Sequence, residues 1–416
     1  MKICLVTAFP PSRRGLNEYG FHLAQELQRD PLLSVTVLAD ELPEAAAELP
    51  DFYVQRAWRF NSLGNPSRLL RAIREVKPDV VWFNLLFSTF GDSPFPAFGG
   101  LAIPAATRLS GYYTHVTLHH LMDNINLSDA GVSFPHLYRM AGSVATRMLL
   151  MANSVSVLLP AYRRTLMEKY RGENVHFRAH GILSARPEYP DFSRRGSPEH
   201  RILAFGKWGT YKRLELLLEA FEQIVAVMPE TRLVIAGGNH PTTPGYVESV
   251  AKQCAGNPRI RFTGYVAEED IPELFSTATA TVMPYSSATG SSGVAHLACE
   301  YGVPIVSADI PDFRQMADDE NLAIEFYRTG SAENLAACLL ELLRNPGRQR
   351  EMAEQNFSAA LRMTMPQIIF SYLRAFSLHQ KAKTLEPISR FRRIPAWVPS
   401  RSAIYRAAAP RWSAWM

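Results

Sequence analysis

Cysteine is scarce in this chain. The 416 residues include four cysteines, which are Cys4, Cys254, Cys299 and Cys338. They are far apart, and none has the spacing of a metal-binding motif. The pattern favours free thiols in a reducing compartment, so we expect a cytoplasmic protein.

A signal peptide and a long apolar run are also missing. Met1 and Lys2 lead directly into the strand-like segment Ile3 to Val6, without a charged leader or a cleavage site. The most apolar region, Val80 to about Ala106, is interrupted by Asn84 and by later aspartate and proline residues. It therefore falls short of an uninterrupted membrane-spanning helix.

Strong charge of one sign is absent as well. The formal net charge is +5, and 20% of the residues are charged. The body of the chain has neither a dense basic patch nor a recognisable reading module, so no nucleic-acid partner is expected. The first strand leads into "AFPPSRRGLN" instead of a G-x-G-x-x-G turn, which argues against a nicotinamide-dependent oxidoreductase.

Short β-branched runs alternate with longer amphipathic stretches along the first half of the chain. Helical patterns include Asn17 to Leu27 and Ser67 to Val76. Strands are expected at Ile3 to Thr7, Ser34 to Leu38, Asp79 to Phe83, His115 to Leu118 and Ser154 to Leu158. The alternation is typical of βαβ units and a parallel sheet.

The alternation stops in the proline-containing stretch Leu183 to His200 and then restarts. Later strands are expected at Ile202 to Phe205, Arg232 to Ala236, Ile260 to Phe262, Ala280 to Met283 and Ile305 to Ser307. Helices are expected at Lys212 to Val227, Tyr246 to Cys254, Glu268 to Ser276 and Val294 to Glu300. We predict an α/β protein with two Rossmann-like, doubly wound domains (1–184 and 185–362) facing a central cleft, followed by a C-terminal segment (363–416).

A loop of small residues precedes one of these helices. "TGSSGV", from Thr289 to Val294, places two glycines and three hydroxyl groups just ahead of an apolar helical run. Helix N-termini carry unpaired N–H groups and partial positive charge, and the glycines Gly290 and Gly293 allow an anion to approach closely. A turn that only caps a buried helix would have the same composition, so both interpretations stay open.

Two lysines follow the first strand of the second domain. Lys207 comes directly after Gly206 at the strand end, and Lys212 falls near the start of the next helical pattern. Two ammonium groups at this position can neutralise a diphosphate leaving group. The alternative is a pair of solvated surface lysines.

Four stretches follow one another in the second half of the chain: "FGKWGTYKRLELLLEAF", "LVIAGGN", "IRFTGYVAEEDIPELFSTATATVMPY" and "GVAHLACEYGVPIVSAD". In this order and spacing they resemble the retaining, nucleotide-sugar-dependent GT-B glycosyltransferases of glycosyltransferase family 4. Earlier stretches, "PPSRRGLNEYGFHLAQEL", "KPDVVWFN", "VTLHH" and "VHFRAHGI", are similar too. The resemblance covers roughly residues 1 to 345. Each motif alone is weak evidence, but a chance match of all of them is improbable.

The resemblance implies roles for particular residues. The expected catalytic residues are Lys207 and Lys212 on the donor diphosphate, and His119 at the donor sugar, with His120 as an alternative in register. The expected donor-binding residues are Gly15, Gly206, Tyr265, Gly290, Ser291, Ser292, Gly293, Val294 and Glu300. No metal ion or other cofactor is expected, because lysines and a helix N-terminus supply the positive charge.

The chain departs from the family's pattern at two glutamates eight positions apart. The ungapped match places Thr289 and Leu297 there, and neither is acidic. The second glutamate usually accepts hydrogen bonds from ribose, so its loss would weaken binding. Glu300 lies one helical turn beyond Leu297 and is the candidate replacement, with a solvated carboxylate as the alternative. In the loop before the first helix, Arg14 stands in place of the family's first glycine.

Other polar residues carry weaker signals. His296 is on the helix of the small-residue loop, where a core or capping histidine is the commoner role. Glu18 and Asp123 are candidate cleft carboxylates without supporting spacing. Tyr265 matches the family's base-binding edge but equally suits packing.

The last residues form a basic and aromatic tail. "ISRFRRIPAWVPSRSAIYRAAAPRWSAWM" has no acidic residue and contains half of the chain's six tryptophans. Such a composition suits an anionic membrane interface, so peripheral contact with the inner face of a membrane is one hypothesis. The resemblance implies instead that the helical stretch Gln367 to Lys381 crosses back to the first domain.

These observations predict a hexosyltransferase that moves a sugar from a nucleotide diphosphate donor to a hydroxyl acceptor, in glycan or polysaccharide assembly. The resemblance implies that the anomeric configuration of the sugar is retained. A glycan, a lipid-linked sugar and a small molecule all stay open as acceptors. Two alternatives keep the fold: a catalytically inactive nucleotide-sugar-binding or regulatory protein, and a nucleotide-sugar epimerase. The missing glutamates motivate the first alternative.

Overall fold

The structure, a computed structural model, describes residues 1–42, 49–124, 135–192, 199–240, 242–287 and 290–392. It forms two compact units, Met1–Ile369 and Phe370–Met416. The first unit contains both predicted sheets, and all of their strands are parallel.

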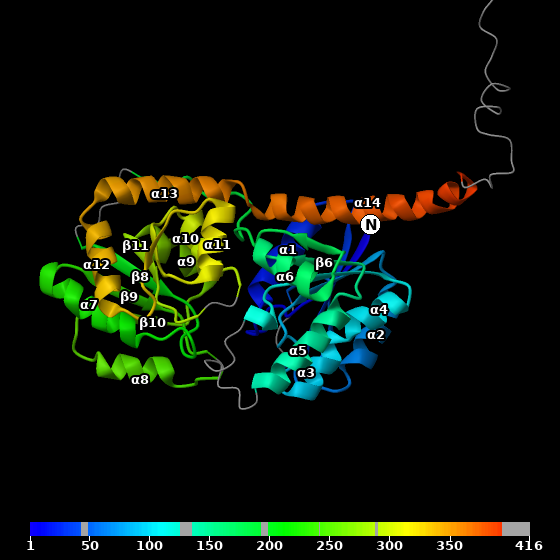
Figure 1. Ribbon diagram of the computed structural model, residues 1–416, viewed down its shortest axis with the longest axis horizontal. Helices are drawn as coiled ribbons and strands as arrows, with labels where there is room; N and C mark the ends of the chain where they lie inside the picture. Colours follow the sequence, from blue (N-terminus) through cyan, green and yellow to red (C-terminus); the bar gives the residue numbers. More distant parts are fainter. Residues whose placement is uncertain (43–48, 125–134, 193–198, 241, 288–289, 393–416) are drawn as a thin grey trace, which may run out of the picture. The chain divides into compact units, whose positions relative to one another are not determined.

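The first sheet has seven strands in the order β3-β2-β1-β4-β5-β6-β7 (Figure 1). The strands are β1 (Lys2–Val6), β2 (Ser34–Asp40), β3 (Val54–Trp58), β4 (Val80–Leu85), β5 (Tyr113–Leu118), β6 (Ser154–Val157) and β7 (Val175–Phe177). They are connected through α1 (Asn17–Gln28), α2 (Asn65–Val76), α3 (Pro94–Leu101), α4 (Ile103–Leu109), the 3-10 helix η1 (Met122–Asn124), α5 (Pro135–Leu149) and α6 (Pro160–Tyr170).

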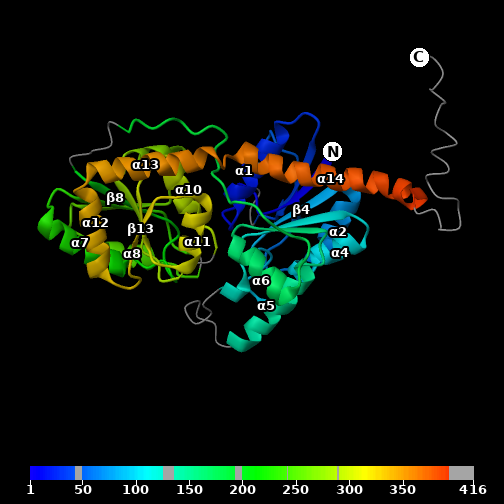
Figure 2. The ribbon, with the colours of Figure 1, turned by 45° about the horizontal axis from the view of Figure 1, so that its top comes forward.

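The second sheet repeats this topology with six strands in the order β10-β9-β8-β11-β12-β13. The strands are β8 (Arg201–Phe205), β9 (Arg232–Ala236), β10 (Ile260–Gly264), β11 (Ala280–Met283), β12 (Ile305–Ala308) and β13 (Ile324–Tyr327). The helices are α7 (Glu215–Val227), α8 (Tyr246–Gln253), η2 (Glu268–Asp270), α9 (Ile271–Ser276), α10 (Gly293–Glu300), α11 (Pro311–Glu320), α12 (Ala332–Leu343) and α13 (Pro346–Leu361). Figure 2 shows α7 and α12 on one face of this sheet and α10 and α11 on the other.

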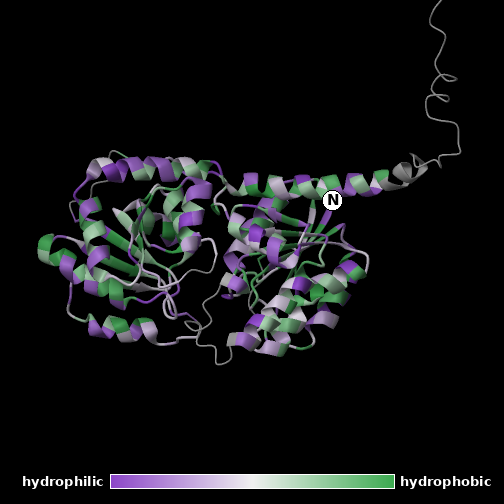
Figure 3. Cartoon of the chain, viewed as in Figure 1, coloured by the Kyte–Doolittle hydropathy of each residue, from purple (hydrophilic) through white to green (hydrophobic). Residues whose placement is uncertain are grey.

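Buried apolar strands form the core of each sheet. Every residue of β4 is buried, as expected for a strand of a parallel sheet covered on both faces. Hydrophobic residues predominate in the strands, whereas the helices mix hydrophobic and hydrophilic residues (Figure 3). The Trp82 indole nitrogen donates to Thr117 Oγ1 at 2.9 Å, so even this large core residue has its polar atom satisfied.

The predicted doubly wound α/β architecture is confirmed, with local differences. Strands β3, β7 and β13 lie outside the predicted set. The helix predicted from Lys212 begins at Glu215, because Gly209 and Lys212 exchange backbone hydrogen bonds in a tight turn ahead of it. The domain limits 1–184, 185–362 and 363–416 stay a prediction.

A long helix, α14 (Met365–Arg392), spans the limit between the two units. Its predicted packing on the first domain stays a prediction, and most of the basic tail, 393–416, lies outside the described residues. Among the helices that the structure describes, none is long and apolar enough to cross a membrane. All four cysteines are free, as predicted.

Candidate functional site

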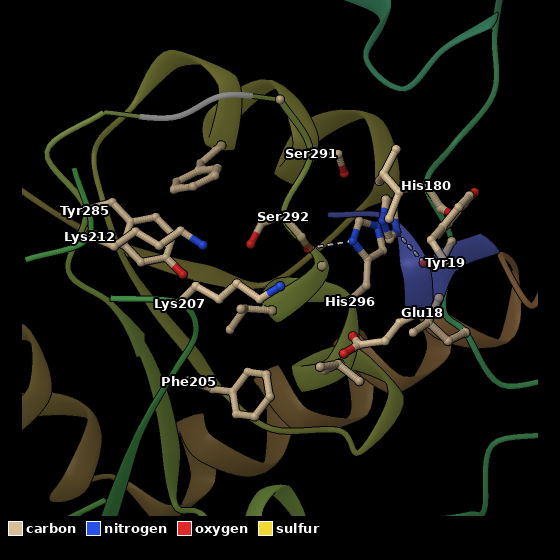
Figure 4. A pocket seen from close by; sticks show the side chains of 18 of the residues that line it. Glu18, Tyr19, His180, Phe205, Lys207, Lys212, Tyr285, Ser291, Ser292 and His296 are labelled. Atoms are coloured by element: carbon tan, nitrogen blue, oxygen red, sulfur yellow. Dashed lines mark hydrogen bonds between the residues drawn. The ribbon is translucent and has the colours of Figure 1, made fainter. Parts of the chain in front are cut away.

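A pocket of about 350 Å³ collects most of the predicted site residues (Figure 4). One side is formed by the start of α1, from Leu16 to Tyr19, together with His180. The other side is formed by Lys207 and Lys212 and by the loop 290–294 at the start of α10.

The topology of the second sheet explains this position. Strands β8 and β11 are neighbours, but the chain leaves β8 toward β9 and leaves β11 toward β12, on the other side. The carboxyl ends of two such strands open a crevice in which ligands of doubly wound folds bind. Lys207 follows β8 and the loop 290–294 follows β11, so both reach this crevice.

The two lysines place positive charge in the pocket without an acidic partner. Within the described residues, neither Lys207 nor Lys212 forms an ion pair with a carboxylate. The Lys212 ammonium lies over the ring of Tyr285, 4.6 Å from its centroid. Burial, together with the positive charge of Lys207, lowers the pKa of Lys212 to about 8. Such a pair is poised to bind an anion that neutralises it.

The loop opposite the lysines requires glycine at position 290. Gly290 has φ of +92°, and a Cβ atom added there would lie 2.5 Å from the carbonyl oxygen of His119. The backbone N–H of Gly290 donates to Asp312 Oδ2 at 3.3 Å, and the hydroxyl of Tyr162 donates to the same oxygen at 2.7 Å. These contacts hold the loop where it turns into α10.

The N-terminus of α10 offers hydrogen-bond donors to the pocket. Ser292 caps the helix, and its Oγ accepts from the N–H of Ala295 at 3.3 Å. In the described part of the chain, the N–H groups of Gly293 and Val294 make no hydrogen bond. Free donors and the helix dipole together favour an anion at this point.

His119 lies at the end of β5, behind the residues that line the pocket. Its Nε2 is 2.7 Å from Asn84 Oδ1, and the Asn84 amide donates to Thr7 Oγ1 at 3.1 Å. Since Asn84 Oδ1 is an acceptor, His119 Nε2 carries a proton and donates. Burial and the neighbouring histidines lower the pKa of His119 well below 6.5. His119 is therefore a neutral imidazole. The ring of Tyr19, which lines the pocket, packs edge-on against it with the ring centroids 4.9 Å apart.

The adjacent His120 is partly buried. Its ring is 5.6 Å from that of Phe87, and burial lowers its pKa to about 4. Neither histidine of the predicted pair is among the residues that line the pocket.

His180 and His296 form a stacked pair that does line it. Their ring centroids are 4.8 Å apart with an interplanar angle of 29°. His296 Nδ1 is 2.7 Å from the carbonyl oxygen of Ser292, and its Nε2 is 2.8 Å from Glu320 Oε2. The hydroxyl of Tyr19 donates to the carbonyl oxygen of His180 at 3.1 Å, which fixes the start of α1 against this pair.

The structure brings together seven of the twelve predicted residues in this pocket: Lys207, Lys212, Gly290, Ser291, Ser292, Gly293 and Val294. Gly206 lies directly beside them, since a Cβ atom added there would be 3.8 Å from Lys212 Nζ. Gly15, His119, Tyr265 and Glu300 are not among the lining residues.

Glu300 lies in a neighbouring pocket with Ser184 and Tyr301. Its Oε2 is buried without a hydrogen-bond partner in the described structure, and burial raises the pKa of Glu300 to about 7. Leu297, one turn earlier, does line the main pocket. The shared helix face therefore does not bring Glu300 to the place that Leu297 occupies.

The other two predicted positions are more peripheral. Tyr265 is 66% exposed, and the guanidinium of Arg13 lies 5.1 Å from the centroid of its ring. Gly15 lies against Leu86, whose Cδ1 would be 3.0 Å from an added Cβ atom. Thr289 lies outside the described residues.

Several residues that the fold places at the site carry only weak signals in the sequence. Glu18 lines the pocket, whereas Asp123, its companion among the candidate carboxylates, pairs with Lys169 and Tyr170. Asn84 and Asp312 hold His119 and Gly290 through contacts made over long sequence separations. His180 belongs to the stretch "VHFRAHGI", which contributed to the resemblance without indicating a role for this histidine. Among the described residues, no three His, Cys, Asp or Glu side chains gather to hold a metal ion.

Comparison with known proteins agrees with this geometry. Residues 199–345, which contain the lysines and the α10 loop, match the family Glycosyl transferases group 1. An 88-residue segment is 30% identical to mannosylfructose-phosphate synthase of Agrobacterium fabrum. That match covers 20% of this chain and only 19% of the length of the relative.

Solved structures resemble the chain over most of its length. Anabaena HepE, solved in complex with UDP and glucose, superposes with a TM-score of 0.68 at 16% identity, covering 91% of this chain and 99% of HepE. Sucrose-phosphate synthase of Thermosynechococcus elongatus gives a TM-score of 0.71 at 15% identity, covering 92% and 99%. The chain thus has the GT-B fold of two Rossmann-like domains, and its residues 199–345 carry the sequence pattern of the glycosyl transferases group 1.

Proposed function

We propose that this protein is a glycosyltransferase that moves a hexosyl group from a nucleotide diphosphate sugar to a hydroxyl acceptor. The observation that carries the proposal is the pair Lys207 and Lys212, which has no acidic partner in the described structure and shares its pocket with the N-terminus of α10. A diphosphate fits this charge and this set of donors.

In this proposal the lysines and the loop act on the leaving group. As the bond between the sugar and the diphosphate breaks, negative charge grows on the phosphate oxygen that departs. Lys207, Lys212 and the N–H groups of Gly293 and Val294 stabilise that charge before and during the step. Lys212, with a pKa of about 8, is mostly protonated at pH 7 and becomes more so when a diphosphate binds.

Retention of the anomeric configuration is part of the proposal and rests on the resemblance to family 4. Glu18 is the one carboxylate among the described residues that line the pocket. A double displacement uses a pair of facing carboxylates, and the described lining does not contain such a pair. Analysis of the product's anomeric configuration by NMR tests this point directly.

UDP sugars are the first donors to test. Anabaena HepE was solved with UDP-glucose and with UDP and glucose, and it shares the fold of this chain. We further propose that no metal ion is required, because the lysines supply the charge that a magnesium ion would bring. Cytoplasmic glycan or polysaccharide assembly, on a glycan, lipid-linked or small-molecule acceptor, is the proposed setting.

Binding and turnover of a donor panel test the function. The panel is the UDP, GDP and ADP forms of glucose, galactose, mannose and N-acetylglucosamine, with and without EDTA. We expect one donor to bind and to be slowly hydrolysed without an acceptor, and Lys212→Ala to abolish both. No binding of any donor at millimolar concentration contradicts the proposal.

The absence of an acidic side chain at Leu297 favours a second candidate, an inactive nucleotide-sugar-binding protein of the same fold. That candidate predicts donor binding without hydrolysis or transfer. A donor recovered as a different sugar, without any transfer product, would instead identify an epimerase.

A further inference from the structure

The pocket that we assign to the donor contains one acidic side chain among cations. Its lining residues include Lys207 and Lys212, and Glu18 is their single acidic neighbour in the described part of the chain. Figure 4 shows the Glu18 carboxylate directed into the pocket, on the side of Lys207. A carboxylate here repels a diphosphate, so its presence calls for another ligand group.

The fold holds the backbone of Glu18 firmly. The next residue, Tyr19, is buried, with its ring against His119 and its hydroxyl donating to the carbonyl oxygen of His180. These contacts fix the first turn of α1 at the pocket wall. Glu18 itself is exposed to the pocket.

The Glu18 carboxylate has free hydrogen-bonding capacity. In the structure as described, no hydrogen bond or ion pair involves its oxygens. A carboxylate has two acceptor oxygens and no donor, so it suits a ligand that presents two neighbouring hydroxyl groups. Nucleotide sugars present such vicinal diols on the ribose and on the transferred sugar.

No other carboxylate of the described residues can serve this purpose in the pocket. Leu297 contributes only an apolar surface, and Glu300 lies in the neighbouring pocket with Ser184. A side chain from the first sheet's half of the chain therefore complements lysines from the second.

We propose that Glu18 binds a vicinal diol of the nucleotide sugar and thereby sets which donors are accepted. The proposal rests on the proposed function, since it names a further contact of the same site. A negatively charged side chain in the first turn of a helix also interacts favourably with the helix dipole and stabilises the helix, which is a purely structural role. The two roles differ in whether substitution changes donor affinity or only stability.

Ligand affinity in Glu18→Gln and Glu18→Ala tests the proposal. The probes are UDP and UDP-glucose, or the nucleotide and sugar pair of the panel that binds best, measured by calorimetry. We expect affinity for the nucleotide sugar to fall about tenfold in Glu18→Gln and about thirtyfold in Glu18→Ala, because a charge-assisted hydrogen bond is lost. Glu26→Gln, two turns further along α1 and paired with Arg29, is the matched control and should leave affinity unchanged.

The same experiment identifies the diol. If Glu18 binds ribose, both variants lose affinity for the free nucleotide as well, and removing the 2′-hydroxyl weakens binding to the wild type but not to Glu18→Ala. If it binds the transferred sugar, only the nucleotide sugar loses affinity. Both results support the proposal.

Unchanged or tighter binding of both probes in the two variants would overturn the role of Glu18, and a lowered melting temperature alone would assign it to the helix. If only the role of Glu18 is wrong, the wild type still turns over a donor. If the proposed function is wrong, the wild type turns over no donor. A wild type that binds no donor overturns both proposals.

Discussion

His296 and Glu320 form a buried pair, with Nε2 2.8 Å from Oε2 and both side chains less than 5% exposed. The other ring nitrogen of His296 faces the carbonyl oxygen of Ser292 at 2.7 Å. A carbonyl oxygen and a carboxylate are both acceptors, so an imidazolium with a proton on each ring nitrogen would satisfy both contacts. The pair ties the capping residue of α10 to the end of α11.

This pair predicts a pH-dependent stability. Burial acts to lower the pKa of His296, but the charge of Glu320 and the two acceptors outweigh it and raise the pKa above 6.5. A raised histidine pKa contributes stability that is full below the unfolded-state pKa and is lost as pH rises through the folded-state value. The contribution of this pair to the free energy of unfolding should therefore decline above pH 6.5.

Comparison with Glu320→Gln isolates this contribution. His119 and His120, whose pKa values are lowered by burial, are present in both proteins and do not contact His296, so their titration cancels in the difference. We expect urea unfolding at pH 6 to 9 to show that the wild type is more stable than Glu320→Gln, and that this difference in the free energy of unfolding shrinks as pH rises. Glu320→Ala should cost about 3 kcal/mol at pH 6, because it leaves a buried charge unpaired. A difference that is constant with pH contradicts the assignment.

Lys212→Met should separate binding from stability. Removing a partly buried cation without an acidic partner in the described structure should raise the free energy of unfolding at pH 7 by about 3 kcal/mol, the equivalent of the lowered pKa. The Lys212 ammonium loses its proton at a lower pH in the folded state than in the unfolded state. The free energy of unfolding of the wild type should therefore rise relative to that of the variant between pH 8 and 10.5. Donor binding should be abolished. A less stable variant would show that Lys212 has a stabilising partner.

Gly290→Ala should weaken both stability and donor binding. The substitution introduces positive φ strain and a clash with the His119 carbonyl oxygen, and we expect it to cost about 3 kcal/mol. Gly330→Ala is the control, because Gly330 has φ of +83° and open space around an added Cβ atom. It should cost about 1 kcal/mol and leave donor affinity unchanged. Equal effects in chemical denaturation would remove the clash from the explanation.

The membrane hypothesis concerns the basic and aromatic tail. Deleting residues 388–416 should reduce sedimentation of the protein with vesicles that contain anionic phosphatidylglycerol, and leave donor hydrolysis intact. Neutral phosphatidylcholine vesicles are the control, since the arginines of the tail need anionic lipid. Vesicle binding that survives the deletion would discard the hypothesis.

The alternation of strands and helices was enough to predict both sheets. Fully apolar runs such as β4 identify central strands from sequence alone. The strands that were missed lie at or near the sheet edges: β3 is only partly buried, and β7 has three residues, two of them exposed. Short, partly polar strands lack the apolar run on which the prediction depends.

The site was predictable where its residues are close together in sequence. Lys207, Lys212 and the loop 290–294 lie in single stretches and were identified from them. Asn84 and Asp312 were not, because their roles come from contacts with partners 35 and 22 residues away. Glu18 could not be identified from the spacing of residues in the sequence. Its proposed role depends on Lys207 and Lys212, which are far away in sequence and which only the fold brings into the same pocket.

The contact between Gly290 and His119 has a consequence for how this sequence can change. Position 290 must satisfy the turn into α10 and must also leave room for the carbonyl oxygen at the end of β5. Two halves of the protein therefore constrain one residue, each for its own reason. Over evolutionary time a side chain could enter at 290 only if the backbone at the end of β5 moved away, so we expect glycine to persist there.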